Sequence, residues 1–193
     1  MEHLYNLIPL LLLVASGIVV LAFDNLLYSL AGLAATYLAT FFLIIQTVPP
    51  GLAFVKLVTG LMACGLIFVS RGEIAEIPKD PSLANRVFKV TALVVVWLVI
   101  FLSAGKIRQL FPLNYETLAG ALIALTGGLL VLGTSRNAIR ITVGILVIYA
   151  GFDLLYTPLE GSILIHGLLS LIAMLIALVG VYVSTRHESE YEE

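Results

Sequence analysis

The stretch "TSRNAIRITVGILVIYAGFDLLY", residues Thr134 to Tyr156, decides the fold class of this chain. It begins with two arginines and an asparagine, continues as a long apolar run and carries an aspartate near its far end. A helix of about 20 apolar residues crosses the hydrocarbon core of a bilayer, and it bonds all of its backbone polar groups internally. We therefore predict a transmembrane helix whose charged residues lie close to its two ends.

The composition of the whole chain agrees with this prediction. Of its 193 residues, 61% are hydrophobic and 11% are charged, and the mean hydropathy is +1.11. Soluble domains carry about 25% charged residues. Apolar runs long enough to cross a bilayer lie at residues 7–23, 26–45, 52–69, 87–104, 118–134, 138–156 and 163–183. We predict an all-α, polytopic transmembrane bundle of about seven helices, or six if the first two runs fuse through Asp24 and Asn25. The first run has no basic residues before it, so we expect it to be a retained helix and not a signal peptide.

The basic residues predict the orientation of the bundle. With seven helices, one side of the membrane receives Arg71, Lys79, Arg86, Lys89, Arg136, Arg140 and Arg186, and the other receives only Lys106 and Arg108. Basic residues are enriched in cytoplasmic loops. We therefore predict an outside N-terminus, a cytoplasmic C-terminus and a cytoplasmic-type membrane, the prokaryotic inner membrane. Arg136, Asn137 and Arg140 are interpreted as topology anchors at the cytoplasmic surface.

Small residues at four-residue spacing predict where helices pack closely. Gly120, Ala124 and Gly128 recur in the fifth apolar run, and Gly60 and Cys64 recur in the third. Small side chains on one helix face let two transmembrane helices approach each other. These residues indicate an assembled bundle and carry no information about chemistry.

Few residues could carry chemistry, and the common catalytic motifs are absent from the sequence. There is no phosphate-binding glycine loop, dinucleotide fingerprint or HExxH pattern, and no basic block that would bind nucleic acid. Of the three histidines only His166 falls in an apolar run, and Cys64 is the single cysteine. We therefore expect no metal site and no cofactor in this chain, and we interpret it as a non-catalytic subunit, leaving an enzyme open.

Four ionisable residues share one predicted depth near the outer surface: Lys56, Asp153, Glu160 and His166. A charge at the bilayer centre costs about 2.5 to 3.5 kcal/mol, so intramembrane charges face partners or water. One interpretation is that these residues are solvated span ends and that Lys56 extends its amine to the interface. The other is a hydrated ion-path cluster in which a proton at Asp153 weakens its attraction for Lys56.

The segment "GGLLVLGTSRNAIRITVGILVIYAGFDLLY", residues 127–156, followed by a seventh helix, resembles the three-helix K-type subunit of respiratory complex I. That family also joins its first two helices by a short cytoplasmic Arg-Asn turn. It includes the corresponding subunits of Mrp-type cation/proton antiporters and energy-converting membrane hydrogenases. The resemblance covers residues 117–186.

The N-terminal half resembles the neighbouring J-type subunit through "FDNLLYSLAGLAATYLATFFLIIQ", residues 23–46, and "FVKLVTGLMACGLIFV", residues 54–69. One chain with both parts is similar to the E-type membrane component of some hydrogenase complexes. The resemblance implies a J-like module at 1–72, a connector, fourth helix and outer loop at 73–116, a K-like module at 117–186 and an acidic tail at 187–193.

The resemblance also implies a function, with one departure. K-type subunits carry a glutamate in each of their last two helices, and the matching positions near Leu146 and Ile172 are not acidic here. We expect an accessory subunit in the membrane arm of a proton- or sodium-translocating redox complex or multisubunit antiporter. Its partners would be antiporter-like and redox subunits. The alternatives are a self-sufficient small transporter or channel, and a membrane enzyme acting on lipid or quinone.

Overall fold

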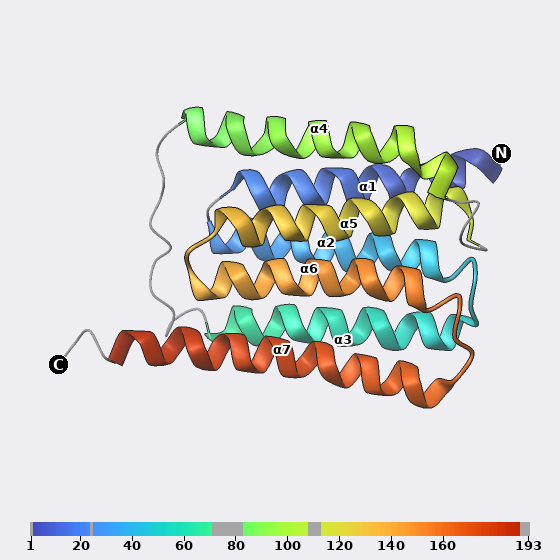
Figure 1. Cartoon of the computed structure of the whole chain (residues 1–193). Coiled ribbons are helices and arrows are strands. Elements are labelled where there is room, and N and C mark those ends of the chain that lie inside the picture. The colour runs from blue at the N-terminus through green and yellow to red at the C-terminus, as the bar shows by residue number, and fades with distance from the viewer. Residues whose placement is uncertain (1, 24, 71–82, 108–112, 190–193) are drawn as a thin grey trace.

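The computed structural model describes residues 2–23, 25–70, 83–107 and 113–189 of the chain (Figure 1). Several residues used to predict the orientation and the first turn lie outside these residues: Arg71, Lys79, Arg108, the side chain of Arg186, and Asp24. The described residues form seven helices: α1 (Glu2–Ala22), α2 (Leu26–Ile44), α3 (Pro50–Val69), α4 (Leu83–Ile107), α5 (Tyr115–Thr134), α6 (Ala138–Tyr156) and α7 (Ile163–Ser189).

The predicted all-α class is confirmed, and six of these helices, α2 to α7, are long and apolar enough to cross a membrane. The apolar segment Leu7–Ala22 of α1 is shorter. Figure 1 nevertheless shows α1 lying alongside α2 and α5 through the bundle. The fused six-helix alternative is wrong, because α1 ends at Ala22 and the Asn25 side chain accepts a hydrogen bond from the Leu27 amide to begin α2.

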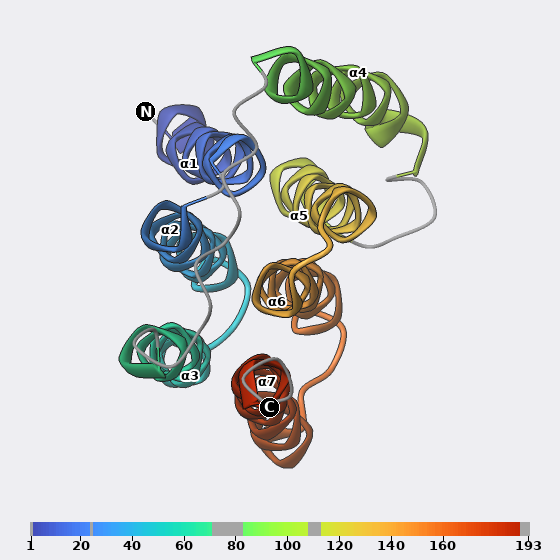
Figure 2. The ribbon, with the colours of Figure 1, turned by 90° about the vertical axis from the view of Figure 1, so that its left-hand side faces the viewer.

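The helices form two facing rows, which Figure 2 shows end-on. One row contains α1, α2 and α3, and the other contains α5, α6 and α7. Within this arrangement α1 contacts α5, α2 contacts α6 and α3 contacts α7, while α4 lies at the end beside α1 and α5. Facing helices run in the same direction, because each row begins on the same side of the bundle (Figure 1).

Corresponding residues of the two rows lie at a constant separation along the chain. Helix ends Ala22 and Thr134 are 112 residues apart, and so are the N-cap residues Asn25 and Asn137. The same separation holds for three more pairs: the helix ends Ile44 and Tyr156, the glycines Gly32 and Gly144, and the tyrosines Tyr37 and Tyr149. A Cβ on Gly32 would lie 3.2 Å from the Ser16 carbonyl oxygen, and a Cβ on Gly144 would lie 3.2 Å from the carbonyl oxygen of Gly128, the residue equivalent to Ser16. The rows are therefore parallel repeats of one three-helix arrangement.

Trp97 holds α4 against the two rows. Its indole Nε1 donates a hydrogen bond to the Ile123 carbonyl of α5 at 3.3 Å, and its side chain is buried. A Cβ on Gly17 of α1 would lie 2.9 Å from the indole ring. The glycine on α1 therefore leaves the space that the large ring occupies.

Helices α5 and α6 approach closely where small residues face each other. A Cβ added to Gly128 would lie 2.7 Å from the Gly144 carbonyl oxygen, and one added to Gly151 would lie 2.8 Å from the Leu125 amide nitrogen. Ala124 is buried in the same contact, 3.0 Å from that Gly151 position. Gly120 instead faces Leu43 of α2. Backbone lies against backbone here, so neither helix can make room for a side chain.

We predict that Gly128→Leu destabilises the bundle by about 1 to 3 kcal/mol, because overpacking forces the two backbones apart. Gly133→Leu is the matched control, since it lies in the same helix and a Cβ there meets no atom within 4 Å. Thermal unfolding of the purified variants in detergent measures the difference. Equal midpoints for the two variants would contradict the close contact.

Candidate functional site

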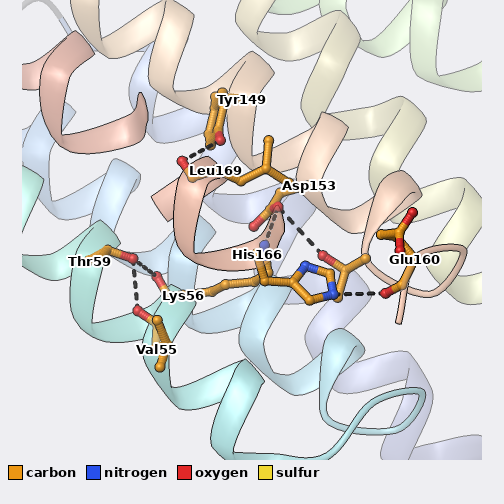
Figure 3. Close-up of polar contacts among 9 residues, drawn as sticks. Val55, Lys56, Thr59, Tyr149, Asp153, Glu160, His166 and Leu169 are labelled. Atoms are coloured by element: carbon orange, nitrogen blue, oxygen red, sulfur yellow. Dashed lines mark hydrogen bonds and ion pairs between the residues drawn. The ribbon is translucent and has the colours of Figure 1, made fainter. Parts of the chain in front are cut away.

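The site is built around an ion pair between Lys56 of α3 and Asp153 of α6 (Figure 3). The Lys56 Nζ donates to the Asp153 Oδ1, and the two side chains are 6% and 11% exposed. Lys56 lies two turns from the start of α3 and Asp153 one turn from the end of α6, so both are near one surface of the bundle. The pair therefore joins one helical row to the other.

Two further side chains surround the Asp153 carboxylate. The Thr157 hydroxyl, at the end of the same helix, donates a hydrogen bond of 3.4 Å to Oδ1. His166 of α7 is 2% exposed and lies within electrostatic range of Asp153. Its Nε2 is 2.8 Å from the Glu160 carbonyl oxygen, and since a carbonyl only accepts, this nitrogen is the donor. The imidazole is thereby fixed between the loop and the carboxylate (Figure 3).

Glu160 takes a different part in the site. Its carboxylate accepts a hydrogen bond from the Ser162 amide at 3.1 Å, immediately before α7 begins, and its backbone carbonyl binds His166. A carboxylate at this position satisfies an amide that has no partner within the helix. Of the four predicted residues, the structure thus pairs Lys56 with Asp153, places His166 beside them and assigns the Glu160 side chain to the loop.

The other row shows that this arrangement of helices forms without charges. Positions 112 residues before Asp153 and His166 are Phe41 and Phe54, whose rings lie 5.0 Å apart. An aromatic pair therefore occupies the equivalent place between α2 and α3. Burying an ion pair contributes little to stability compared with apolar packing, because desolvation opposes the Coulombic attraction. Packing alone gives no reason for the carboxylate of Asp153 and the imidazole of His166 at these positions.

Sequence reasoning missed the tyrosines that line the site. The ring of Tyr37 lies against Gly60, where a Cβ would collide with it, and its hydroxyl is buried. The Tyr149 hydroxyl donates to the Leu169 carbonyl of α7. Tyr37 and Tyr149 are within electrostatic range of each other and of Asp153. Their polar atoms inside apolar runs were the signal that could have revealed them.

The three predicted topology anchors lie at the opposite end of the bundle. Arg136 is exposed, and the Asn137 side chain caps α6 by accepting from the Ile139 amide at 2.9 Å. Arg140 is 4% exposed, and its guanidinium donates to the Val20 carbonyl in the last turn of α1 at 3.1 Å. A cation at this place bonds a terminal carbonyl and opposes the negative end of the helix dipole. Arg140 therefore joins the rows at this end.

Cys64 of α3 is a buried free thiol, two helical turns from Lys56 on the same helix. Within the part of the chain that the structure describes, no three His, Cys, Asp or Glu side chains are grouped to hold a metal ion.

Comparisons of the chain with protein-family models, with curated proteins and with solved structures gave no match. The fold and the site nevertheless define a class. The chain is an α-helical integral membrane protein in which two parallel three-helix rows are joined by a buried Lys–Asp ion pair.

We predict that Lys56→Met or Asp153→Leu alone destabilises the protein by about 3 to 5 kcal/mol, since either change leaves a buried charge without its partner. The double variant should recover most of this loss, because an apolar pair replaces the ions. Equilibrium unfolding of all three variants in mixed micelles measures the coupling. Lys106→Met, an exposed lysine, is the control. Single-variant losses no larger than the control's would show that the pair does not hold the rows together.

Proposed function

We propose that this chain is an accessory membrane-arm subunit of a proton- or sodium-translocating redox complex or multisubunit cation/proton antiporter. In this role the Lys56–Asp153 pair is the element that responds to the translocated ion. The observation that carries the proposal is the burial of both charges at the contact between the two rows. Intramembrane ionisable residues are costly and mark ion or proton paths.

The switching mechanism follows from electrostatics in a medium of low dielectric constant. While Asp153 is ionised, it attracts Lys56 strongly, because few water molecules screen the pair. A proton that reaches the Asp153 carboxylate removes its charge and leaves the lysine without a counter-ion. The contact between α3 and α6 then weakens, so a protonation event becomes a change in how the rows meet.

The surface of the bundle supports a role within a larger assembly. Helices α4 and α7 bury the smallest share of their apolar spans, whereas α2 and α6 bury most of theirs. Large apolar side chains on α4 and α7, including Leu102, Leu164 and Leu175, are exposed. Such surfaces suit contact with lipid and with further membrane subunits. The resemblance of residues 117–186 to K-type subunits indicates which subunits these are.

The departure from K-type subunits limits the proposed route. Leu146 is fully buried in α6 and Ile172 lies on α7, so apolar side chains occupy the positions that match the family's two glutamates. A relay of carboxylates across the midplane is therefore not proposed for this chain. The cluster around Asp153 takes its place, and the proposed orientation puts this cluster on the outer side of a prokaryotic cytoplasmic membrane.

A second candidate function is a self-sufficient small transporter. It is favoured by the two parallel rows and by the position of the ion pair at their contact. Several transporter families bind substrate between internal repeats and move one repeat against the other. In this case the chain would act without further subunits.

We predict that Lys56→Met or Asp153→Asn lowers ion translocation by the assembled complex by about tenfold or more, because neither variant can form and break the ion pair. Proton or sodium flux into vesicles measures the effect, and Lys106→Met should leave it unchanged. Normal flux in both variants, with normal assembly, would restrict the pair to a structural role.

Purification from native membranes separates the two candidate functions. A chain tagged at its C-terminus is extracted in mild detergent, and the proteins that accompany it are identified by mass spectrometry. We expect antiporter-like subunits together with redox subunits. A homogeneous chain without partners that transports ions in liposomes would overturn the subunit proposal and favour the transporter.

A further inference from the structure

Among the described residues, three buried side-chain atoms have no hydrogen-bond partner: the Tyr37 hydroxyl, the His166 Nδ1 and the Ser170 hydroxyl. The three residues are 6%, 2% and 7% exposed. An unsatisfied buried polar group costs about 1 to 3 kcal/mol, and nearly all such groups in folded proteins are bonded to protein or to ordered water. The three atoms lie on α2 and α7, both of which pack against α3 and α6, and a common explanation is needed.

All three face the junction of α2, α3, α6 and α7. His166 and Ser170 are one turn apart on α7, on the buried face that continues through Ala173 and Ala177. Tyr149 binds the Leu169 carbonyl, directly before Ser170. Tyr37 packs on Gly60 of α3, and it lies within electrostatic range of both Asp153 and Tyr149. Tyr37 and His166 thus lie within electrostatic range of Asp153, and Ser170 lies one turn further along α7 from His166.

We propose that Tyr37, His166 and Ser170 line an internal water site that connects the outer surface to the Lys56–Asp153 pair. A buried water makes about three hydrogen bonds, so one or two waters would satisfy the three unsatisfied atoms together. The site ends at Tyr37 and Ser170, because the next residues on the buried face of α7 are Ala173 and Ala177. It is therefore open to one side of the membrane only.

His166 is the residue through which a proton enters this site, a step that rests on the proposed function. Its Nε2–H is held by the Glu160 carbonyl, which leaves the Nδ1 lone pair facing inward. Nδ1 accepts a proton from a water of this site, which takes up a proton from water at the surface, and Nδ1 then releases the proton through the same water to the Asp153 carboxylate. The imidazole returns to its neutral form, and Asp153 becomes a neutral acid. The titratable and charged groups of the helices and loop around this junction are Lys56 and Cys64 on α3, Tyr37 on α2, Asp153 and Tyr149 on α6, and Glu160 in the loop.

Cysteine accessibility tests the water site without any transport assay. Because Cys64 is the single cysteine, Cys64→Ala gives a cysteine-free chain into which Ser170→Cys, Ala173→Cys or Leu171→Cys is introduced. Ala173 is the buried control one turn deeper, and Leu171 is the lipid-facing control. Thiols react as thiolates, which form in water and not in lipid or dry protein. A charged methanethiosulfonate is added to right-side-out or inside-out vesicles.

We expect Ser170→Cys to react about tenfold or more faster than both controls, and only from the outer side. Reaction no faster than that of Ala173→Cys would show that the junction is dry and would overturn the proposal. Reaction from the cytoplasmic side alone would overturn outer access.

A second variant tests the proton step separately. His166→Gln keeps an N–H that reaches the Glu160 carbonyl but removes Nδ1, so we expect the pH profile of transport to change while assembly and the reactivity of Ser170→Cys stay normal. An unchanged pH profile would overturn the role of His166. If Ser170→Cys reacts, the water site is supported. If Asp153→Asn also transports normally, the proposed function is refuted while the water site stands.

Discussion

The absence of water in the hydrocarbon core is the constraint on which this structure depends. Every backbone amide and carbonyl of a spanning segment must find its partner within the protein, so the apolar runs form helices. Helices in lipid gain no hydrophobic energy by meeting each other, and close packing of small residues has to hold them together. Gly128, Gly144 and Gly151 provide that contact between α5 and α6. Helices α5 and α6 therefore pack against each other at the residues with the smallest side chains.

The same constraint explains how the protein places its buried charges. At one end Arg140 of α6 binds a terminal carbonyl of α1, and at the other Lys56 of α3 binds Asp153 of α6. Both contacts join one row to the other. They differ in chemistry, because the Val20 carbonyl that Arg140 binds is a permanent dipole, whereas the Asp153 carboxylate can gain a proton. The proposed response to an ion therefore rests on the Lys56–Asp153 contact.

The internal repeat gives a comparison within one chain. The two rows share helix ends, N-cap asparagines and close glycine contacts at a separation of 112 residues. They differ where Phe41 and Phe54 correspond to Asp153 and His166. Phe41 is buried and Phe54 is exposed, whereas Asp153 and His166 are both buried and Asp153 binds Lys56 of the other row. Equivalent backbone positions thus hold aromatic residues that pack together in one row and ionisable residues in the other.

The sequence by itself determined the class and the helices. Apolar length acts locally, so residues 138–156 were predicted with the ends that α6 has, although Asn137 was interpreted as a topology anchor and not as the N-cap that it is. It also placed Lys56, Asp153 and His166 at one depth, because depth follows from distance along a helix. Only the tertiary structure decided which helix faces meet. Three features depend on how the helices are rotated and which of them touch: the pairing of Lys56 with Asp153, the inward hydroxyl of Tyr37 and the repeat. Helices that are apolar on all sides carry no sequence pattern that predicts this rotation.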